Sequence, residues 1–326
     1  LSVAPMMDWT DRHCRAFHRA LSNGALLYTE MVTSAALVRG GAAHLLDFGA
    51  GEHPVALQLG GSDPGELAEA ARMGAARGYD EVNLNVGCPS DRVQSGTFGA
   101  VLMRDPERVA ACLRAMADAV QVPVTVKCRI GVDDQDPAAV LPDFLSRMRD
   151  AGVTRIAVHA RKAWLQGLSP KENRDVPPLD HPLVQAMKAR FPDLHLSVNG
   201  GIASLDAAAD FLEAGMDGVM IGRAAYQRPW DILGRADSRI WGRADPCAGP
   251  EDAVAAMRPH IAAHLEAGGR LHEVTRHMLG LFAGRPGARA WRRILSEGAT
   301  RGGAGLALVD DALEAVAAGG VAQAAE

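Results

Sequence analysis

The sequence has no long apolar segment and no paired cysteines. No run of about 18 apolar residues occurs in its 326 residues, so we expect no membrane span. Its five cysteines, at positions 14, 88, 112, 128 and 247, form no CxxC pair and no metal-ligand spacing. We therefore expect neither a bound metal nor structural disulfides. An odd number of scattered thiols favours the reducing cytoplasm.

The net charge of the chain is also small and negative, which limits how the protein could bind nucleic acid. Charged residues make up 22% of the chain and the net charge is −5, which disfavours binding nucleic acid over the whole surface. A nucleic-acid function would need a local basic patch. Apolar residues make up 48% of the chain, enough for a substantial core in one large domain, or in one large and one small domain.

Short apolar runs alternate with helical stretches along most of the chain. There are eight runs, spaced on average about 30 residues apart, which is the length of one βα unit. No GxGxxG motif follows the first run, which argues against a Rossmann fold. Eight evenly spaced strands with crossover helices predict an α/β TIM (β/α)8 barrel. The predicted strands are Ser2–Ala4, Ala25–Tyr28, Val55–Leu59, Glu81–Asn85, Val124–Cys128, Arg155–His159, Leu194–Asn199 and Gly218–Ile221.

Three helices begin at recognisable caps, where a side-chain acceptor precedes the first turn. In two of them a proline occupies the first helical position, where its missing N–H is not needed. These helices are Glu66–Arg77 after Asp63-Pro64 and before Gly78, Glu107–Ala119 after Asp105-Pro106, and Asp206–Glu213 after Ser204 and before Gly215.

The composition changes after Trp241. Segment 242–251 is rich in glycine, proline and small polar residues, which is typical of a linker. We therefore expect a catalytic barrel domain over residues 1–241 and a small helical domain over residues 252–326. The helices predicted in the second domain are Asp252–Glu266, Leu271–Phe282, Ala288–Glu297 and Asp310–Ala318.

Two glycine-rich turns follow the last two predicted strands. In a TIM barrel the active site lies at the carboxyl ends of the strands. Asn199-Gly200-Gly201 and Gly222-Arg223 stand at two such ends, each near a helix start. Their backbone N–H groups could hold a phosphate, and Arg223 could add a charge-assisted contact. Either turn alone could be only a tight turn, but two in these places favour a phosphate-bearing ligand.

Gln58, Lys127 and His159 also lie at strand ends and point into the same space. This set suits a flavin, because an amide can read the pyrimidine edge of the ring and a cation can stabilise its anionic reduced form. Alternatives stay open. Lys127 could form a salt bridge inside the barrel or a Schiff base with a substrate, and His159 could be a structural histidine.

Cys88 follows the fourth strand, between Gly87 and Pro89. A loop thiol opposite a flavin is placed to give or take a proton. The alternative is a buried apolar filler. We assign that role to Cys14, Cys112 and Cys247, and also to Cys128, whose side chain should point away from that of Lys127.

Several motifs together resemble the tRNA-dihydrouridine synthases over nearly the whole chain. They are Ala4-Pro5-Met6, Asp11-Arg12-His13-Cys14-Arg15, Asn85-Val86-Gly87-Cys88-Pro89-Ser90, Val126-Lys127-Cys128-Arg129-Ile130-Gly131, His159-Ala160-Arg161 and Asn199-Gly200-Gly201. Residues 159–174 and 284–293 resemble subfamily A, whose members modify positions 20 and 20a of the tRNA D-loop. One departure is Cys128, where relatives often carry threonine.

The resemblance implies an FMN-dependent reduction of uridine to 5,6-dihydrouridine. Reduced flavin gives hydride to C6 of the base, and Cys88 gives the proton to C5. NADPH or NADH reduces the flavin in a separate half-reaction, and the target base must be flipped out of the tRNA. The residues implied to bind FMN are Ala4, Pro5, Met6, Gln58, Lys127, His159, Asn199, Gly200, Gly201, Gly222 and Arg223.

A tRNA partner is implied as well, and it needs local basic patches. Asn85 is expected to meet the target base. Two groups of basic residues could form such patches, although each group could instead be ordinary solvent-exposed surface. We expect a monomer with no obligate protein partner. The basic residues are Arg161, Lys162, Lys171 and Arg174 after the sixth strand, and Arg285, Arg289, Arg292, Arg293 and Arg301 in the helical domain.

Two rival functions remain. One is an FMN barrel enzyme that acts on a free small molecule, in the manner of a dihydroorotate dehydrogenase, with the loop residue acting as a base. The other is a tRNA-binding chaperone that keeps a flavin for stability. NADPH oxidation that needs unmodified tRNA, and does not occur with free uridine, would separate all three.

Overall fold

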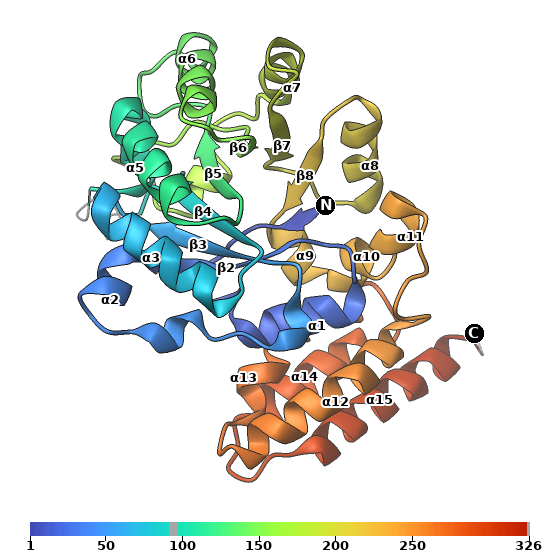
Figure 1. Ribbon diagram of the computed structural model, residues 1–326. Coiled ribbons are helices and arrows are strands. Elements are labelled where there is room, and N and C mark those ends of the chain that lie inside the picture. The colour runs from blue at the N-terminus through green and yellow to red at the C-terminus, as the bar shows by residue number, and fades with distance from the viewer. Residues whose placement is uncertain (91–96, 325–326) are drawn as a thin grey trace.

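The computed structural model describes residues 1–90 and 97–324, and its centre is an eight-stranded parallel barrel (Figure 1). Neighbouring strands pair in the order β1-β8-β7-β6-β5-β4-β3-β2. The last edge closes where Ser2 bridges Leu26 in parallel. The predicted TIM barrel is therefore confirmed. Its strands are β1 (Ser2–Val3), β2 (Leu27–Thr33), β3 (Val55–Gly60), β4 (Glu81–Val86), β5 (Val124–Arg129), β6 (Arg155–His159), β7 (His195–Asn199) and β8 (Gly218–Ile221).

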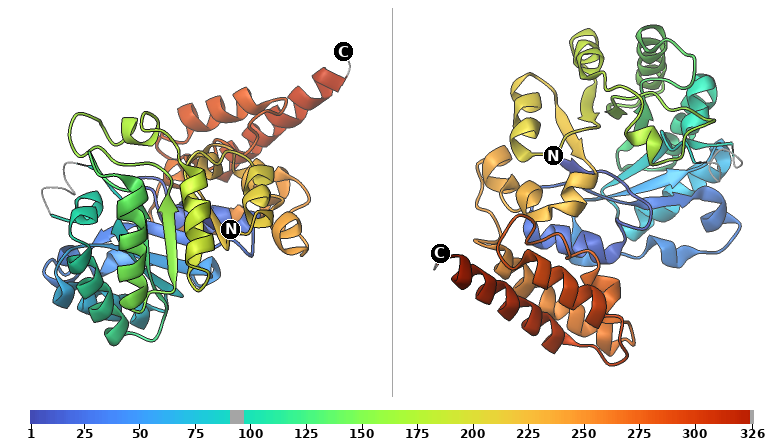
Figure 2. Two further views of the ribbon diagram at one scale, coloured as in Figure 1. Left: turned by 90° about the horizontal axis from the view of Figure 1, so that it is seen from above. Right: turned by 180° about the vertical axis from the view of Figure 1, so that it is seen from behind.

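Helices surround the barrel (Figure 2). The predicted caps are confirmed: Asp63, Asp105 and Ser204 each accept a hydrogen bond from a backbone N–H of the following first turn. The helices are α1 (Arg12–Leu21), α2 (Ser34–Val38), α3 (Pro64–Arg77), α5 (Pro106–Ala119), α6 (Pro137–Asp150), α7 (His181–Arg190), α8 (Leu205–Glu213), α9 (Arg223–Gln227), α10 (Pro229–Leu233) and α11 (Ala236–Trp241).

The barrel interior is polar at its amino-terminal end. Glu81 accepts hydrogen bonds from the hydroxyls of Tyr28 and Thr125, both at 2.6 Å, and pairs with Arg155 at 2.8 Å. Because side chains alternate along a strand, Lys127 points inward one layer above Thr125. Cys128 faces the opposite way and is fully buried in the apolar layer between barrel and helices.

Four further helices form a group packed beside α1 (Figure 1). Trp291 lies fully buried inside this group, and its indole N–H donates to the carbonyl of Met278 at 3.0 Å. No helix within residues 1–90 and 97–324 is long and apolar enough to cross a membrane. The helices are α12 (Pro250–Glu266), α13 (Leu271–Thr275), α14 (Ala288–Gly298) and α15 (Leu306–Ala324).

Several predicted boundaries were wrong, the largest differences being in β2, α13 and α15, the last of which ends at Ala324 and not at Ala318. Strand β2 runs on to Thr33, because its polar residues lie at the open end of the barrel and a register shift follows Tyr28. Helix α13 ends at Thr275, and turns replace the predicted helix as far as Phe282. In these turns Gly280 packs against the barrel, where a Cβ would lie 2.3 Å from the carbonyl oxygen of Gln227. Helix α15 starts four residues early, at Leu306.

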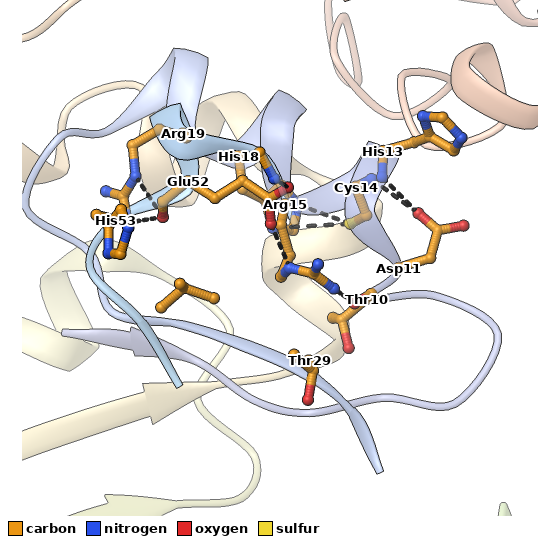
Figure 3. Close-up of polar contacts among 12 residues, drawn as sticks. Thr10, Asp11, His13, Cys14, Arg15, His18, Arg19, Thr29, Glu52 and His53 are labelled. Atoms are coloured by element: carbon orange, nitrogen blue, oxygen red, sulfur yellow. Dashed lines mark hydrogen bonds and ion pairs between the residues drawn. The ribbon is translucent and has the colours of Figure 1, made fainter. Parts of the chain in front are cut away.

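Helix α1 is fixed to the barrel by a buried ion pair and by hydrogen bonds (Figure 3). Arg15 Nε lies 2.6 Å from Glu52 Oε2, and Arg15 also donates to the carbonyl of Thr10 at 2.9 Å. Arg19 donates to the carbonyls of Ser22, Ala25, Glu52 and Pro54. Paired buried charges of this kind hold a segment in one place, so the loop that leads into α1 is well positioned.

Candidate active site

A chain of amide side chains crosses the barrel at the ends of β3 and β4. Gln58 Nε2 donates to Asn83 Oδ1, and Asn85 Nδ2 donates to Gln58 Oε1, both at 2.8 Å. Asn83 Nδ2 in turn donates to Thr125 Oγ1 at 2.8 Å. These residues occupy inward positions of adjacent strands, which is why alternate residues of the sequence meet here. Gln58 is 1% exposed, so any contact with a ligand would use its second amide hydrogen.

Asn85 also holds the loop that carries Cys88. Its Oδ1 accepts the backbone N–H of Gly87 at 3.0 Å and that of Cys88 at 2.9 Å. Such a side-chain cap fixes a turn directly after a strand. The Cys88 thiol is half-buried and donates to Ser90 Oγ at 3.5 Å. The other four cysteines are buried, as the sequence predicts.

Lys127 lies beside Asn85 in the register of β4 and β5. Its ammonium group makes no hydrogen bond or ion pair with residues 1–90 or 97–324. Burial, followed by the nearby charge of Arg129, lowers the pKa of Lys127 to about 8. Within the described chain, the interior salt bridge that the sequence left open for this lysine is not formed.

His159 ends β6 and is 8% exposed. Burial, and then the charges of Arg129 and Lys127, hold the pKa of His159 well below its usual value, so the imidazole is neutral. Its ring makes no hydrogen bond with the described residues. Gly200 packs directly on this ring: its φ is 109°, and a Cβ there would lie 2.5 Å from His159 Cδ2. Only glycine fits this position.

Arg129 is a residue to which sequence reasoning gave no role. Its buried guanidinium donates to the carbonyls of Gly87 at 2.9 Å, Lys162 at 3.0 Å and Asn173 at 2.9 Å. It therefore ties the Cys88 loop to the long loop after β6. Its inward position, two residues after Lys127, is the signal that could have identified it.

The predicted phosphate turns lie next to each other at the ends of β7 and β8. Asn199 Nδ2 donates to the carbonyl of Met220 at 2.7 Å, and Gly201 has a φ of 71°. Gly222 lies near Met6, since a Cβ on it would be 3.7 Å from Met6 Sδ. Arg223 is 38% exposed at its side chain and pairs with Asp175 at 2.8 Å. A phosphate would have to share Arg223 with Asp175.

Two of the basic residues after β6 have partners within the protein. Lys162 Nζ donates to the carbonyl of Asp133 at 2.8 Å and lies over the ring of Trp164. Arg161 donates to the carbonyl of Pro177. Lys171 and Arg174, in contrast, are exposed.

On the helical side, Arg289, Arg292 and Arg293 are exposed on α14. Arg285 is also exposed and lies over the ring of Trp230, with 5.4 Å between its guanidinium carbon and the ring centre. These guanidinium groups stand at the surface, where they can reach a large anionic partner.

The residues at this end of the barrel fit a flavin mononucleotide. The Lys127 ammonium and the His159 ring make no hydrogen bond with residues 1–90 or 97–324, so both groups are free to contact a ligand at the barrel opening. The adjacent turns at Gly200, Gly201 and Gly222 would offer backbone N–H groups to a phosphate. A cation, a neutral imidazole and a glycine cradle together match the needs of a flavin ring and its phosphate.

Comparison with known proteins agrees with this geometry. A family model described as dihydrouridine synthase matches residues 2–317. A tRNA-dihydrouridine(20/20a) synthase of Shewanella oneidensis is 54% identical over 322 residues, which cover 99% of this chain and 95% of the relative. Its counterpart in Escherichia coli K12 is 56% identical over 317 residues, which cover 97% of this chain and 91% of the relative. A Vibrio parahaemolyticus synthase is 53% identical over 314 residues, covering 96% and 95%.

Proposed function

Because the chain belongs to the dihydrouridine synthase family, we propose that it reduces uridines 20 and 20a of tRNA to 5,6-dihydrouridine with FMN and NADPH or NADH. The observation that carries this proposal is the placement of Cys88 by Asn85 at the open end of the barrel, next to Lys127. This arrangement would bring a proton donor close to a cation that forms no ion pair with residues 1–90 or 97–324.

Residues from five strands would hold the cofactor. Lys127 and His159 would face its ring, with Ala4, Pro5 and Met6 beside it. When bound, reduced FMN supplies the hydride that adds to C6 of uracil. Asn199, Gly200, Gly201, Gly222 and Arg223 would hold the phosphate.

Cys88 supplies the proton at C5. Addition at C6 leaves negative charge on the C5–C4–O4 portion of uracil, and the S–H bond breaks as the C5–H bond forms. The cationic side chains of Lys127, Arg129 and Arg174 lie close enough to Cys88 to interact with it electrostatically.

The tRNA would bind across the barrel opening and the helical group. The uracil must leave its stack to reach Cys88. Asn85 would meet the base, and the amide hydrogen that Gln58 does not accept supports this role. Arg289, Arg292 and Arg293 would contact phosphates, as would Lys171 and Arg174 on the opposite side.

The test is NADPH oxidation with unmodified tRNA transcripts. We expect steady oxidation with the transcript, none with free uridine, and dihydrouridine at positions 20 and 20a when the product is mapped. Turnover of free pyrimidines, or oxidation without any product in the RNA, would contradict the proposal. Mapping of tRNA from a strain that lacks the gene gives the same answer in the cell.

A further inference from the structure

A pocket lies between the barrel and the C-terminal helices, outside the site described above. It has a volume of about 620 Å³, within the range of roughly 300–1,000 Å³ that is usual for small-ligand sites. Three segments line it: the loop before α1, the end of α9, and the helical group. The lining residues used below are Asp8, Trp9, Tyr226, Gln227, Arg276 and Arg292.

The pocket presents an aromatic surface. The rings of Trp9 and Tyr226 stack with their centres 4.3 Å apart and their planes 13° apart, and both residues remain partly exposed. Tyr226 is held from behind by His277, whose Nδ1 lies 3.2 Å from the tyrosine hydroxyl. Exposed, supported aromatic rings are the standard platform on which proteins stack unpaired nucleobases.

The pocket also has a cation available for an anionic ligand. Arg276 is committed to the protein, because it pairs with Asp11 at 2.5 Å and donates to the carbonyl of Asp8 at 2.8 Å. Arg292 is exposed and forms no ion pair with any residue in 1–90 or 97–324. The Asp8 carboxylate and the Gln227 amide add hydrogen-bonding groups that suit the polar edge of a base.

The walls are fixed in advance of binding. Asp11 caps α1 by accepting the backbone N–H groups of His13 and Cys14 (Figure 3). It also pairs with His277 at 3.0 Å, so one carboxylate joins the barrel loop to the helical group. Gly280 brings the opposite wall against the Gln227 backbone. A preformed site loses little entropy on binding.

The pocket adjoins the opening of the barrel. Trp9 follows Met6, which lies beside the predicted cofactor turns, by only three positions in the chain. Three residues span at most about 11 Å. A single RNA segment can therefore place one base in the barrel and another nucleotide on Trp9.

We propose that this pocket binds a second, unpaired nucleotide of the RNA substrate, with its base stacked on Trp9 and its phosphate at Arg292. The proposal rests on the proposed function, since it needs RNA as the substrate. It assigns Trp9 a positioning role: the residue fixes the strand so that the target uridine enters the barrel.

The test combines three variants with tRNA transcripts that each lack a single base. Trp9→Leu removes the ring, Trp9→Phe keeps an aromatic face, and Arg292→Ala removes an exposed cation. Arg114→Ala, an exposed arginine on α5, is the matched control. We expect Trp9→Leu and Arg292→Ala to weaken tRNA binding by roughly fivefold or more, while Trp9→Phe and Arg114→Ala bind almost as wild type.

The base-deleted transcripts identify the occupant. At one position other than the modified uridines, loss of the base should weaken binding to the wild-type protein but not to Trp9→Leu. FMN content and the rate of flavin reduction by NADPH should stay unchanged. If Trp9→Leu fails to fold, Arg292→Ala and the transcript series on the wild-type protein carry the test.

The proposal is overturned if the effects of base loss and Trp9→Leu add independently at every position, or if Arg292→Ala binds tRNA as tightly as wild type. An altered KM for NADPH with unchanged tRNA binding would also overturn it, because the occupant would then be the dinucleotide. Failure of the wild-type protein to bind or reduce tRNA at all would instead refute the proposed function.

Discussion

The side-chain oxygen of Asn85 accepts the backbone N–H of Cys88 at 2.9 Å, so the last inward residue of β4 sets the position of the thiol. The same side chain is anchored to Gln58 on β3. The loop that carries the thiol is thus tied to the barrel by Asn85, and also by Arg129 at the Gly87 carbonyl and by the Ala100 N–H at the Cys88 carbonyl. Catalytic groups supported in this way keep their geometry.

Asn85→Ala should therefore displace Cys88 without removing it. Because a shift of about 1 Å can lower a rate roughly 10²-fold, we expect a decrease of that order in single-turnover formation of dihydrouridine. Asn85→Asp keeps the acceptor and should recover part of the rate. Alkylation of the Cys88 thiol reports its position independently: an unchanged alkylation rate and pH profile in Asn85→Ala would contradict the positioning role.

Arg129→Met should destabilise the protein, since it leaves three carbonyl groups without their buried donor. At about 1–3 kcal/mol for each unsatisfied group, the free energy of unfolding should fall by about 3 kcal/mol or more. Denaturant unfolding measures this. Arg147→Met is the control, because its ion pairs with Asp143 and Glu107 lie on the surface and contribute little. Equal stability of the two variants would refute the role given to Arg129.

Lys127 should make FMN affinity depend on pH. Its pKa in the ligand-free protein is lowered to about 8. The side chain is therefore fully protonated well below pH 8 and loses its proton as the pH rises through 8. An anionic ligand favours that form, so the dissociation constant of FMN should be flat near pH 7 and rise above pH 8, by at most about tenfold per pH unit. Titration of apoprotein between pH 7 and 9 tests this. Lys127→Met should bind more weakly with no such rise; the same slope in both proteins would exclude Lys127 as the source.

Charge reversal at Arg289 or Arg293 should weaken tRNA binding and leave the cofactor in place. Both side chains are exposed on α14, remote from Lys127 and His159 in the chain. Each lost phosphate contact should also reduce the salt dependence of binding by about one unit of slope. Filter binding at several salt concentrations, with Arg114→Glu as the control, measures both effects. Loss of FMN in Arg289→Glu or Arg293→Glu would contradict this division of labour.

Periodicity and caps were enough to predict the barrel, because eight strands and their helix starts are local features of the sequence. The extra length of β2 was not predictable, since its polar residues Thr29 and Glu30 look like a loop until the barrel opening is in place. The early end of α13 depends on the contact of Gly280 with Gln227, which are distant in sequence.

The residues of the candidate site could be predicted in the same way, from their positions at the ends of the strands. Lys127, His159 and Cys88 do meet at one end of the barrel, as alternation along the strands predicts. The tertiary partners were missed: Asp175 pairs with Arg223, the Asp133 carbonyl accepts a hydrogen bond from Lys162, and Arg129 joins the Cys88 loop to the loop after β6. Pairings between distant segments leave no periodic signal in the sequence, and neither does the pocket at Trp9.

The central claim is that the Cys88 thiol delivers the proton to C5 of uracil. Single-turnover reaction of pre-reduced Cys88→Ala enzyme with unmodified tRNA tests it most directly. We expect NADPH still to reduce the bound flavin at the wild-type rate, while formation of dihydrouridine at positions 20 and 20a stops. Dihydrouridine formed at the wild-type rate by Cys88→Ala would contradict it.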